Sequence, residues 1–416
     1  MARILDVWFH GNKAGQLHQE DGGRLQFVYA ADYLKSEQPW PLSVSMPPGA
    51  APFEDRIARP FFSGLLPEDL IRRKVAKLLG VSEKNPFSML EAIGGECAGA
   101  LSLYAQGTPP HKENPDDINM LDEQHLDEIF EELKRRPLFA GEDGIRLSLA
   151  GAQDKLAVRM IGDKLALMRG GAPTTHILKT LISDRHAVTD SVHNELFCLM
   201  LAARCGLSVP HAEMRRTPRQ PYLLVKRYDR TSQDNAPVRL HQEDFCQALS
   251  VPPENKYERE GGPGISACLD SIQKHSVEPL PDRIEFLNIV IFNYLIGNAD
   301  AHGKNFSLLY DKGRPRLAPA YDLLSTAVYP ELARKMAMKI GGKYEPDEVY
   351  LRHWHRLVPD TAGARNAVEK NLAEMAETTL DQATKLHDEL KKENITSPIL
   401  DSIVALIKKR SARLRQ

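Results

Sequence analysis

Apolar and polar residues alternate along residues 3–30, around the glycine-containing turns HGNKAG and EDGG. This period is typical of antiparallel strands joined by tight turns. After Pro60 the apolar spacing becomes that of a helix, which runs through Leu70 and Leu79 and stops at Gly80. The segment GGECAGALSLY then returns to a strand pattern. We therefore predict a compact α+β unit that ends near Tyr104.

After Tyr104 the pattern predicts a linker, a region of strands and a mostly helical region. Residues 106–120 are polar and rich in proline, which predicts a linker or surface loop. Residues 144–180 hold strand-like runs between glycine turns, for which a β-meander is the simplest interpretation. A helix capped near Ser191 and closed by Gly206 follows, and from Asp282 the chain is predicted to be mostly helical. The predicted parts are residues 1–105, 121–230 and 231–416.

Charge and cysteine content narrow the class of protein. The 416 residues include 54 Lys and Arg against 56 Asp and Glu, so nucleic acid is not bound through bulk positive charge. Five scattered cysteines without a CxxC pair favour reduced thiols. The first residues are not typical of a secretory signal, and the longest apolar run, 286–297, is too short for a membrane span. We expect a cytoplasmic protein without a membrane partner.

Polar residues with catalytic potential follow that apolar run directly. The segment GNADAHGKNFS places Asp300, His302 and Asn305 between the predicted core helix and the next strand. Each residue alone is more typical of a turn or a helix cap. Together they are typical of a catalytic loop, because catalytic groups tend to lie on loops held between rigid elements.

The spacing within this segment is that of a phosphoryl-transfer site. In kinases one Asp accepts the substrate hydroxyl proton, an Asn five residues later binds Mg²⁺, and a later Asp binds the metal too. Asp300 and Asn305 have this offset, FSLLYDKGRPRLAP predicts a hairpin, and Asp322 follows it. Oxygen ligands of this type suit Mg²⁺. The sequence therefore predicts a kinase-type site.

A kinase site also needs a lysine that holds ATP phosphates and a helix acid that orients it. Lys179 and Glu195 are the candidates in the right chain order, although each alone is more typical of an exposed residue. The segment SLAGAQDK precedes Lys179, where a phosphate-covering loop is expected, and matches neither a Walker A nor a GxGxxG motif. An ordinary hairpin turn remains the alternative there. The candidate loop residues are Ala150, Gly151 and Ala152.

Taken together, the motifs of the chain resemble the HipA family, the serine/threonine kinase toxins of bacterial toxin–antitoxin pairs. The resemblance covers nearly the whole chain and implies an α+β, two-lobed protein-kinase-like fold, with a mixed α/β N-terminal lobe and a mainly helical C-terminal lobe. The DxHxxN loop is further similar to that of phosphoinositide-3-kinase-like enzymes. The motifs are FFSGLLPE, PFSMLEAIGGECAGAL, LSLAGAQDKLAV, TTHILK, HNELFCLMLA, LVKRYDR, QEDFCQAL, YEREGGPGI, IGNADAHGKNFSLL and LAPAYDLLS.

The resemblance also implies roles for single residues. Asp300 would be the catalytic aspartate, with His302 and Lys304 as its loop neighbours, and Asn305 and Asp322 would bind Mg²⁺. Ser148 aligns with the autophosphorylation serine of the family, whose modification ejects the glycine-rich loop and switches the kinase off. An ordinary strand serine is the alternative. The residues implied in ATP binding are Ser148, Ala150, Gly151, Ala152, Lys179, Glu195, Lys226, Tyr228, Gln242 and Tyr321.

The hinge that would face adenine is LVKRYDR, through the backbone of Lys226 and Tyr228. The sequence departs from the family pattern at Lys226, where an acidic residue is expected. A contact through the backbone survives this change, whereas a contact through the side chain does not follow from the resemblance.

The activity that the resemblance implies is phosphorylation of a translation component, such as an aminoacyl-tRNA synthetase, which arrests growth and leads to persistence. A HipB-like DNA-binding antitoxin dimer would neutralise the kinase and carry it to operator DNA, where the complex represses its operon. Two alternatives stay open. A small-molecule kinase of the aminoglycoside-phosphotransferase type shares the Asp, Asn and Asp arrangement. A catalytically silent corepressor would use the basic segment IKKRSARLR.

Overall fold

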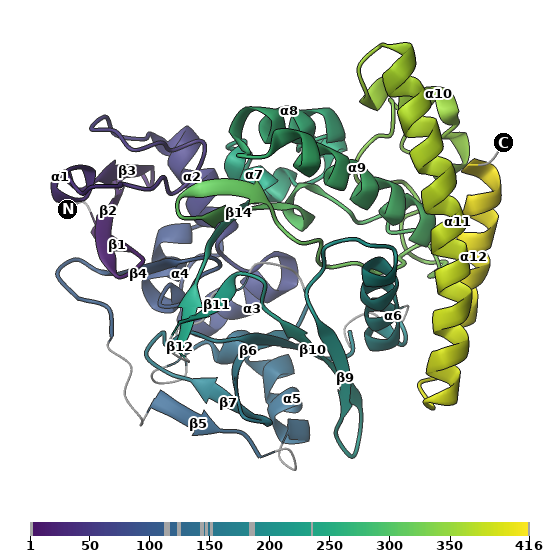
Figure 1. Cartoon of the computed structure of the whole chain (residues 1–416). Helices are drawn as coiled ribbons and strands as arrows, with labels where there is room; N and C mark the ends of the chain where they lie inside the picture. Colours follow the sequence, from purple (N-terminus) through teal and green to yellow (C-terminus); the bar gives the residue numbers. More distant parts are fainter. Residues whose placement is uncertain are drawn as a thin grey trace. The chain divides into compact units, whose positions relative to one another are not determined.

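The computed structural model describes residues 3–111, 117–122, 126–141, 145, 149, 153–182, 188–233 and 236–414. The chain forms two compact units, each assembled from separate stretches of sequence (Figure 1). The described chain contains both helices and sheets, which agrees with the predicted α+β class. The first unit comprises Met1–Thr180, Arg215–Glu254 and Leu308–Pro315, and the second comprises Leu181–Met214, Asn255–Ser307 and Arg316–Gln416.

The first unit begins with the antiparallel sheet that the alternating pattern predicts. Its strand order is β3-β2-β1-β4. Residues such as Leu5, Leu17 and Phe27 stand opposite one another across the strands and are fully buried, so one face of this sheet forms a core. The strands are β1 Arg3–Phe9, β2 Asn12–Gln19, β3 Leu25–Tyr29 and β4 Leu101–Ala105.

The helices that cover this sheet differ slightly from the predicted pattern. The apolar segment after residue 54 forms two helices instead of one, because Pro67 between them cannot donate a helical hydrogen bond. Gly80 ends the second of them in a left-handed conformation (φ 67°), which confirms the predicted stop. The helices are α1 Ala31–Leu34, α2 Asp55–Gly64, α3 Asp69–Leu79 and α4 Pro86–Ile93.

A larger sheet has the order β5-β7-β6-β8-β10-β9. The predicted β-meander is wrong in one respect, because β8 pairs with β6 and not with β7. Lys179 stands opposite Lys155, and His176 stands opposite Val158. The free edge of β7 is taken by β5 instead, with Ile118 opposite Met168. Helix α5 Leu126–Arg135 follows β5 in the chain. The strands are β5 Ile118–Met120, β6 Lys155–Ile161, β7 Lys164–Met168, β8 His176–Lys179, β9 Ala212–Arg216 and β10 Pro221–Lys226.

Two small sheets complete the strands. The predicted hairpin around DKGRP is confirmed, since β14 and β15 are neighbours in the sheet β13-β14-β15. Lys312 and Gly313 both have positive φ at its turn. The strands are β11 Arg230–Gln233, β12 Ala236–Arg239, β13 His241–Asp244, β14 Ser307–Asp311 and β15 Arg314–Leu317, and α7 Phe245–Ala248 follows β13.

The second unit is built around α9 Pro279–Ile296, whose last two turns are almost wholly buried. This confirms the core helix predicted from the apolar run. Helices α8, α11 and α12 contact α9, and α11 lies along α12 (Figure 1). The other helices are α6 Ser191–Arg204, α8 Ile265–His275, α10 Leu351–Trp354, α11 Ala362–Lys392 and α12 Pro398–Leu414. Short 3₁₀ helices are η3 Pro137–Phe139, η4 Pro253–Asn255, η5 Glu258–Glu260, η6 Gly303–Asn305, η7 Pro346–Glu348 and η8 His355–Leu357.

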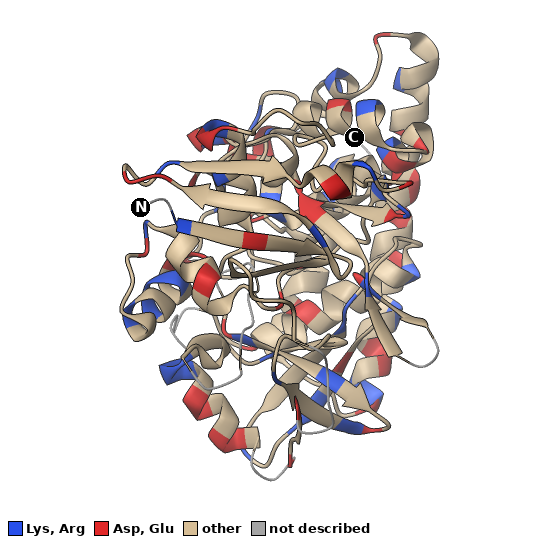
Figure 2. Cartoon of the chain, turned by 90° about the vertical axis from the view of Figure 1, so that its left-hand side faces the viewer, with Lys and Arg blue, Asp and Glu red and all other residues tan. Residues whose placement is uncertain are grey.

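The distribution of charge agrees with the balanced composition. Figure 2 shows basic and acidic residues interspersed along the individual helices and strands. Within the described part of the chain, every helix is too short or too polar to cross a membrane.

Candidate functional site

The candidate catalytic loop begins where α9 ends. Gly297 adopts a left-handed conformation (φ 79°, ψ 33°) that turns the chain out of the helix, and its N–H donates to Asn293 O at 3.1 Å. Asn298 N also donates to Asn293 O at 2.9 Å. These bonds satisfy helix carbonyls that would otherwise be unpaired. The loop therefore leaves the buried helix at a defined angle.

The side chain of Asn298 ties three segments together. Its amide nitrogen donates to Asn293 Oδ1 at 2.9 Å and to the carbonyl oxygen of Asp322 at 3.3 Å. Its amide oxygen accepts a hydrogen bond from Asp300 N at 3.1 Å. Because Asn298 is only 5% exposed, these bonds are shielded from water and costly to lose. One amide thus links the helix end, Asp300 and the Asp322 segment.

Tyr321 provides a second link between the same two segments. Its hydroxyl donates to Lys304 O at 2.6 Å and lies 2.7 Å from Ser307 Oγ. These two residues flank Asn305, so the residue before Asp322 holds the chain on both sides of Asn305. The structure therefore joins the loop of Asp300 and Asn305 to the later Asp322 segment in one hydrogen-bonded cluster of the second unit.

The candidate loop residues differ in burial. Asp300 is exposed, as a group that meets a substrate must be, whereas His302 and Lys304 are 7% and 6% exposed. His302 N donates to Asp300 O at 2.8 Å, and Asn305 N donates to His302 O at 2.9 Å, which closes the tight turn of η6. The loop therefore presents the Asp300 carboxylate from a rigid, buried base.

Asn305 and Asp322 suit a divalent cation. Asn305 Oδ1 is buried and has no hydrogen-bond partner among the described residues, so a strong acceptor is left for a ligand. Asp322 has a left-handed backbone (φ 52°), a costly conformation for a non-glycine residue that often occurs at functional sites. The described residues contain no cluster of three or more His, Cys, Asp or Glu that could hold a metal. A metal here would rest on one amide and one carboxylate, as Mg²⁺ commonly does when water and phosphate complete its shell.

Helix α6 supports the Asp322 segment from its buried face. Asn194 is fully buried, and its amide oxygen accepts from Ser325 N at 2.7 Å while its amide nitrogen donates to Ser325 O at 2.9 Å. Thr326 Oγ1 accepts from Ala299 N at 2.7 Å, which joins this segment to the loop again. Asn194 and Thr326 thus fix the segment after Asp322 to α6 and to the catalytic loop.

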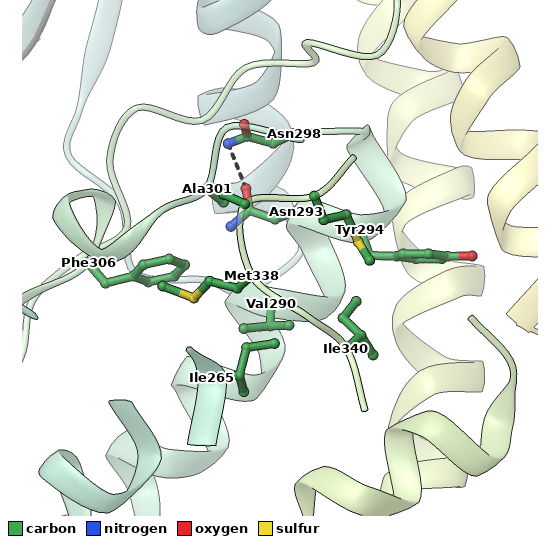
Figure 3. Close-up of a pocket in the computed structure, with 11 residues that line it drawn as sticks. Ile265, Val290, Asn293, Tyr294, Asn298, Ala301, Phe306, Met338 and Ile340 are labelled. Carbon is green, nitrogen blue, oxygen red and sulfur yellow. Dashed lines mark hydrogen bonds between the residues drawn. The ribbon is translucent and has the colours of Figure 1, made fainter. Parts of the chain in front are cut away.

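A small apolar pocket lies behind the loop (Figure 3). Asn293 and Asn298, joined by their hydrogen bond, form the polar part of its wall, and Ala301 and Phe306 come from the loop itself. The other lining residues are Ile265, Val290, Tyr294, Met336, Ala337, Met338 and Ile340. The loop is therefore backed by apolar side chains.

The remaining described candidates fall in separate units. Lys179 ends β8 in the first unit and is 6% exposed, and Glu195 lies on α6 in the second unit and is 5% exposed. Burial of this extent excludes the alternative of two solvated surface charges, because Lys and Glu are rarely so buried unless they are paired. Ser148, Ala150, Gly151 and Ala152 lie outside the described residues.

The predicted hinge is held rigidly within the first unit. The Tyr228 hydroxyl donates to Gln242 Oε1, which brings two predicted nucleotide contacts together, whereas Lys226 is exposed. Arg227 Nη2 lies 2.8 Å from Asp229 Oδ2, and Arg230 Nη2 contacts the buried Glu96 at 2.8 Å. Burial alone would raise the pKa of Asp229, but the two arginines lower it. A buried ion cluster thus fixes the segment that was predicted to be the hinge.

Sequence reasoning missed the residues that hold the site together. Tyr321 was expected to contact ATP and not to hold the loop, Asn298 was part of a motif without a role, and Asn194, Tyr257 and Thr326 received no role. Their contacts join positions far apart in sequence, so spacing carries no signal for them. The only local signal was the presence of amides within an apolar helix end, at Asn293 and Asn298.

Comparison with known proteins gives the family. A model of the HipA N-terminal domain matches residues 5–104, and a model of the HipA-like C-terminal domain matches residues 147–384. The chain belongs to the HipA family. The family expected from the sequence motifs is thereby confirmed.

Individual relatives cover most of this HipA-family chain. It is 42% identical over 388 residues to Y4mE of Sinorhizobium fredii, and 92% of each chain is covered. The name of Y4mE describes a proposed kinase. It is 29% identical over 375 residues to the Serine/threonine-protein kinase toxin HipA of Shewanella oneidensis, covering 85% of this chain and 84% of that protein. A solved structure of the Shewanella oneidensis MR-1 toxin–antitoxin system HipA, HipB and its operator DNA complex matches with a TM-score of 0.81 and 26% identity, covering 99% of this chain and 96% of that chain.

Proposed function

We propose that this HipA-family chain is an ATP- and Mg²⁺-dependent protein serine/threonine kinase that acts as the toxin of a toxin–antitoxin pair, on a phosphoinositide-3-kinase-like version of the kinase fold. The names of its relatives support a kinase and a toxin. The observation that carries the proposal is the cluster in which Asn298 and Tyr321 join the segments of Asp300, Asn305 and Asp322.

In the proposed reaction the Asp300 carboxylate accepts the proton of a serine or threonine hydroxyl while the hydroxyl oxygen attacks the γ-phosphorus of ATP. The bond from the γ-phosphorus to the β,γ-bridging oxygen breaks, ADP leaves, and Asp300 later releases its proton to water. Asn305 and Asp322 would hold Mg²⁺, which neutralises charge on the phosphates when bound. Lys304 and His302 keep the loop rigid from their buried positions.

The proposed ATP contacts are the residues that the HipA resemblance implies. Lys179 would bind phosphate and be oriented by Glu195, and the backbone of Lys226 and Tyr228 would face adenine. Phosphate on Ser148 would add roughly two negative charges beside the ATP phosphates and so weaken nucleotide binding. The other proposed contacts are Ala150, Gly151, Ala152, Gln242 and Tyr321.

We propose a HipB-like antitoxin dimer as the partner, with operator DNA reached through it in a repressing complex. The support is the likeness to the structure titled as a HipA, HipB and operator DNA complex. The proposed substrate is a cytoplasmic protein of the translation machinery, such as an aminoacyl-tRNA synthetase, whose phosphorylation arrests growth.

The test measures transfer of labelled phosphate from ATP in the presence of Mg²⁺ by wild type, Asp300→Asn and Ser148→Ala, followed by mass spectrometry. We expect label at Ser148 in the wild type and none in either variant. Asp300→Asn should still bind the antitoxin, which controls for folding, and should lose toxicity. A toxic Asp300→Asn protein would contradict the role of Asp300. Label on an aminoglycoside instead of a protein would favour the small-molecule kinase, and antitoxin binding without any transfer would favour the silent corepressor.

A further inference from the structure

Tyr257 contacts the carboxylate at the centre of the proposed reaction. Its hydroxyl donates to Asp300 Oδ1 at 2.6 Å, a length typical of a strong bond to a charged acceptor. The other oxygen, Oδ2, accepts no hydrogen bond from any residue that the structure describes, and the Asp300 side chain is exposed. One carboxylate oxygen is therefore engaged by the protein, and the other is open to an incoming group.

The backbone on both sides of Tyr257 is bound to the loop or to its support. Lys256 O accepts from Gly303 N at 3.1 Å, and Glu258 N donates to Ala337 O at 3.2 Å. Ala337 N in turn donates to Ala299 O at 2.9 Å, next to Asp300. These bonds make Tyr257 a fixed part of the loop's surroundings and argue against a segment that swings away from Asp300.

The ring of Tyr257 is held as well as its backbone. It meets the His302 ring edge to face, with centroids 5.1 Å apart and an interplanar angle of 89°. The Arg259 guanidinium carbon lies 5.3 Å from the centroid of the same ring. With ring and backbone both held, the hydroxyl has a defined position beside Asp300.

We propose that Tyr257 is a positioning residue for phosphoryl transfer, which fixes the Asp300 side chain through Oδ1 so that Oδ2 faces the substrate hydroxyl. This inference rests on the proposed function. A proton acceptor must lie within about 2.6–3.2 Å of the hydroxyl it serves, and a free carboxylate on an exposed loop samples several rotamers. Holding one oxygen removes this freedom and keeps the reacting oxygen in place.

The test is Tyr257→Phe, which keeps the ring against His302 and removes only the hydroxyl. We expect kcat to fall by about 10- to 100-fold while KM for ATP stays within about twofold, because orientation of the acceptor is lost and nucleotide binding is untouched. 4-Aminophenylalanine at position 257 restores a donor at the same place and should recover part of the rate, which a loss of folding would not allow. Tyr344→Phe is the matched control, because it also removes one tyrosine hydroxyl from the second unit. Among the described residues this hydroxyl has no hydrogen-bond partner, so kcat should not change.

A double variant separates action through Asp300 from other effects. In an Asp300→Asn background, Tyr257→Phe should cause no further loss of the residual turnover, because the two residues act as a unit. An unchanged kcat in Tyr257→Phe, or an equal loss in both backgrounds, would overturn the inference and leave the proposed kinase standing. A wild type without phosphoryl transfer in the same assay would overturn the kinase proposal and this inference together.

Discussion

The side-chain amide of Asn298 donates a hydrogen bond to the main-chain carbonyl oxygen of Asp322, 24 residues later, at 3.3 Å. The same side chain accepts from Asp300 N, so the proposed proton acceptor and the proposed metal ligand share one buried amide. Their separation is therefore set by a residue that need not touch substrate. Displacement of either group by a fraction of an ångström is expected to slow a reaction that depends on alignment.

Replacement of Asn298 by alanine should affect both stability and rate. It removes the partner of Asp300 N and of the Asp322 carbonyl, which should lower the free energy of unfolding by about 1–3 kcal/mol. The rate of phosphoryl transfer should fall by at least about tenfold at temperatures where the variant is folded. Chemical denaturation and a kinase assay measure the two effects. Asn371→Ala is a matched control, because Asn371 bonds to Asn288 on α9 away from the loop; equal rate losses in both variants would contradict the role of Asn298.

Gly297 should tolerate no side chain at the end of α9. Its φ of 79° is strained for other residues, and an added Cβ would lie 2.5 Å from Leu406 Cδ2 and 2.9 Å from Ala327 Cβ. We expect Gly297→Ala to lower the free energy of unfolding by about 1–3 kcal/mol. Gly363→Ala in α11 meets nothing within 4 Å and should be neutral or slightly stabilising. Thermal unfolding of the two variants tests this contrast, and equal midpoints would speak against strain at Gly297.

Removal of the Asn305 amide should raise the requirement for Mg²⁺. If the buried Oδ1 of Asn305 binds the metal, Asn305→Ala should need at least about tenfold more Mg²⁺ for half-maximal phosphoryl transfer. Chelation with EDTA should abolish transfer by the wild type, and added Mg²⁺ should restore it. Titration of Mg²⁺ at saturating ATP is the measurement. An unchanged Mg²⁺ requirement in the variant would remove Asn305 from the metal site.

Glu243 should make the stability of the first unit depend on pH. Burial raises the pKa of Glu243 to about 7, although Ser43 Oγ at 2.5 Å, the Tyr310 hydroxyl and Val44 N at 2.9 Å donate to it and lower the pKa. The folded state therefore binds more protons than the unfolded state between pH 4.5 and 7. The stabilisation from its protonation is fully present below about pH 4.5 and is lost as the pH rises to about 7, by up to roughly 3 kcal/mol.

The variant Glu243→Gln should lose this dependence. Burial lowers the pKa of His10 to about 4 and of His241 to about 3, which makes stability rise with pH over part of the same range. Both histidines are present in wild type and variant, so the difference between the two denaturation curves isolates Glu243. The difference should change steadily between pH 4.5 and 7 and level off above. A constant difference across this range would show that Glu243 is charged throughout.

Much of the fold could be predicted because its signals are local. Alternation around glycine turns marked β1 to β3, helical spacing with Gly80 marked α3, and an apolar run with Gly297 marked the end of α9. The pairing of β8 with β6 could not be predicted, because strands pair through backbone groups, and β6 and β7 both offered a free edge to β8. In the structure β5 occupies the free edge of β7, and β8 pairs with β6.

The sequence by itself determined the family of this protein and the chemical types at its candidate site, since Asp300, Asn305 and Asp322 stand at offsets that a kinase loop requires. Only the tertiary structure decided how these residues are held. Asn298, Tyr321 and Tyr257 act through hydrogen bonds to segments distant in the chain. Such bonds depend on where the packing of α9 and its neighbours brings each backbone, and local sequence periodicity does not record that.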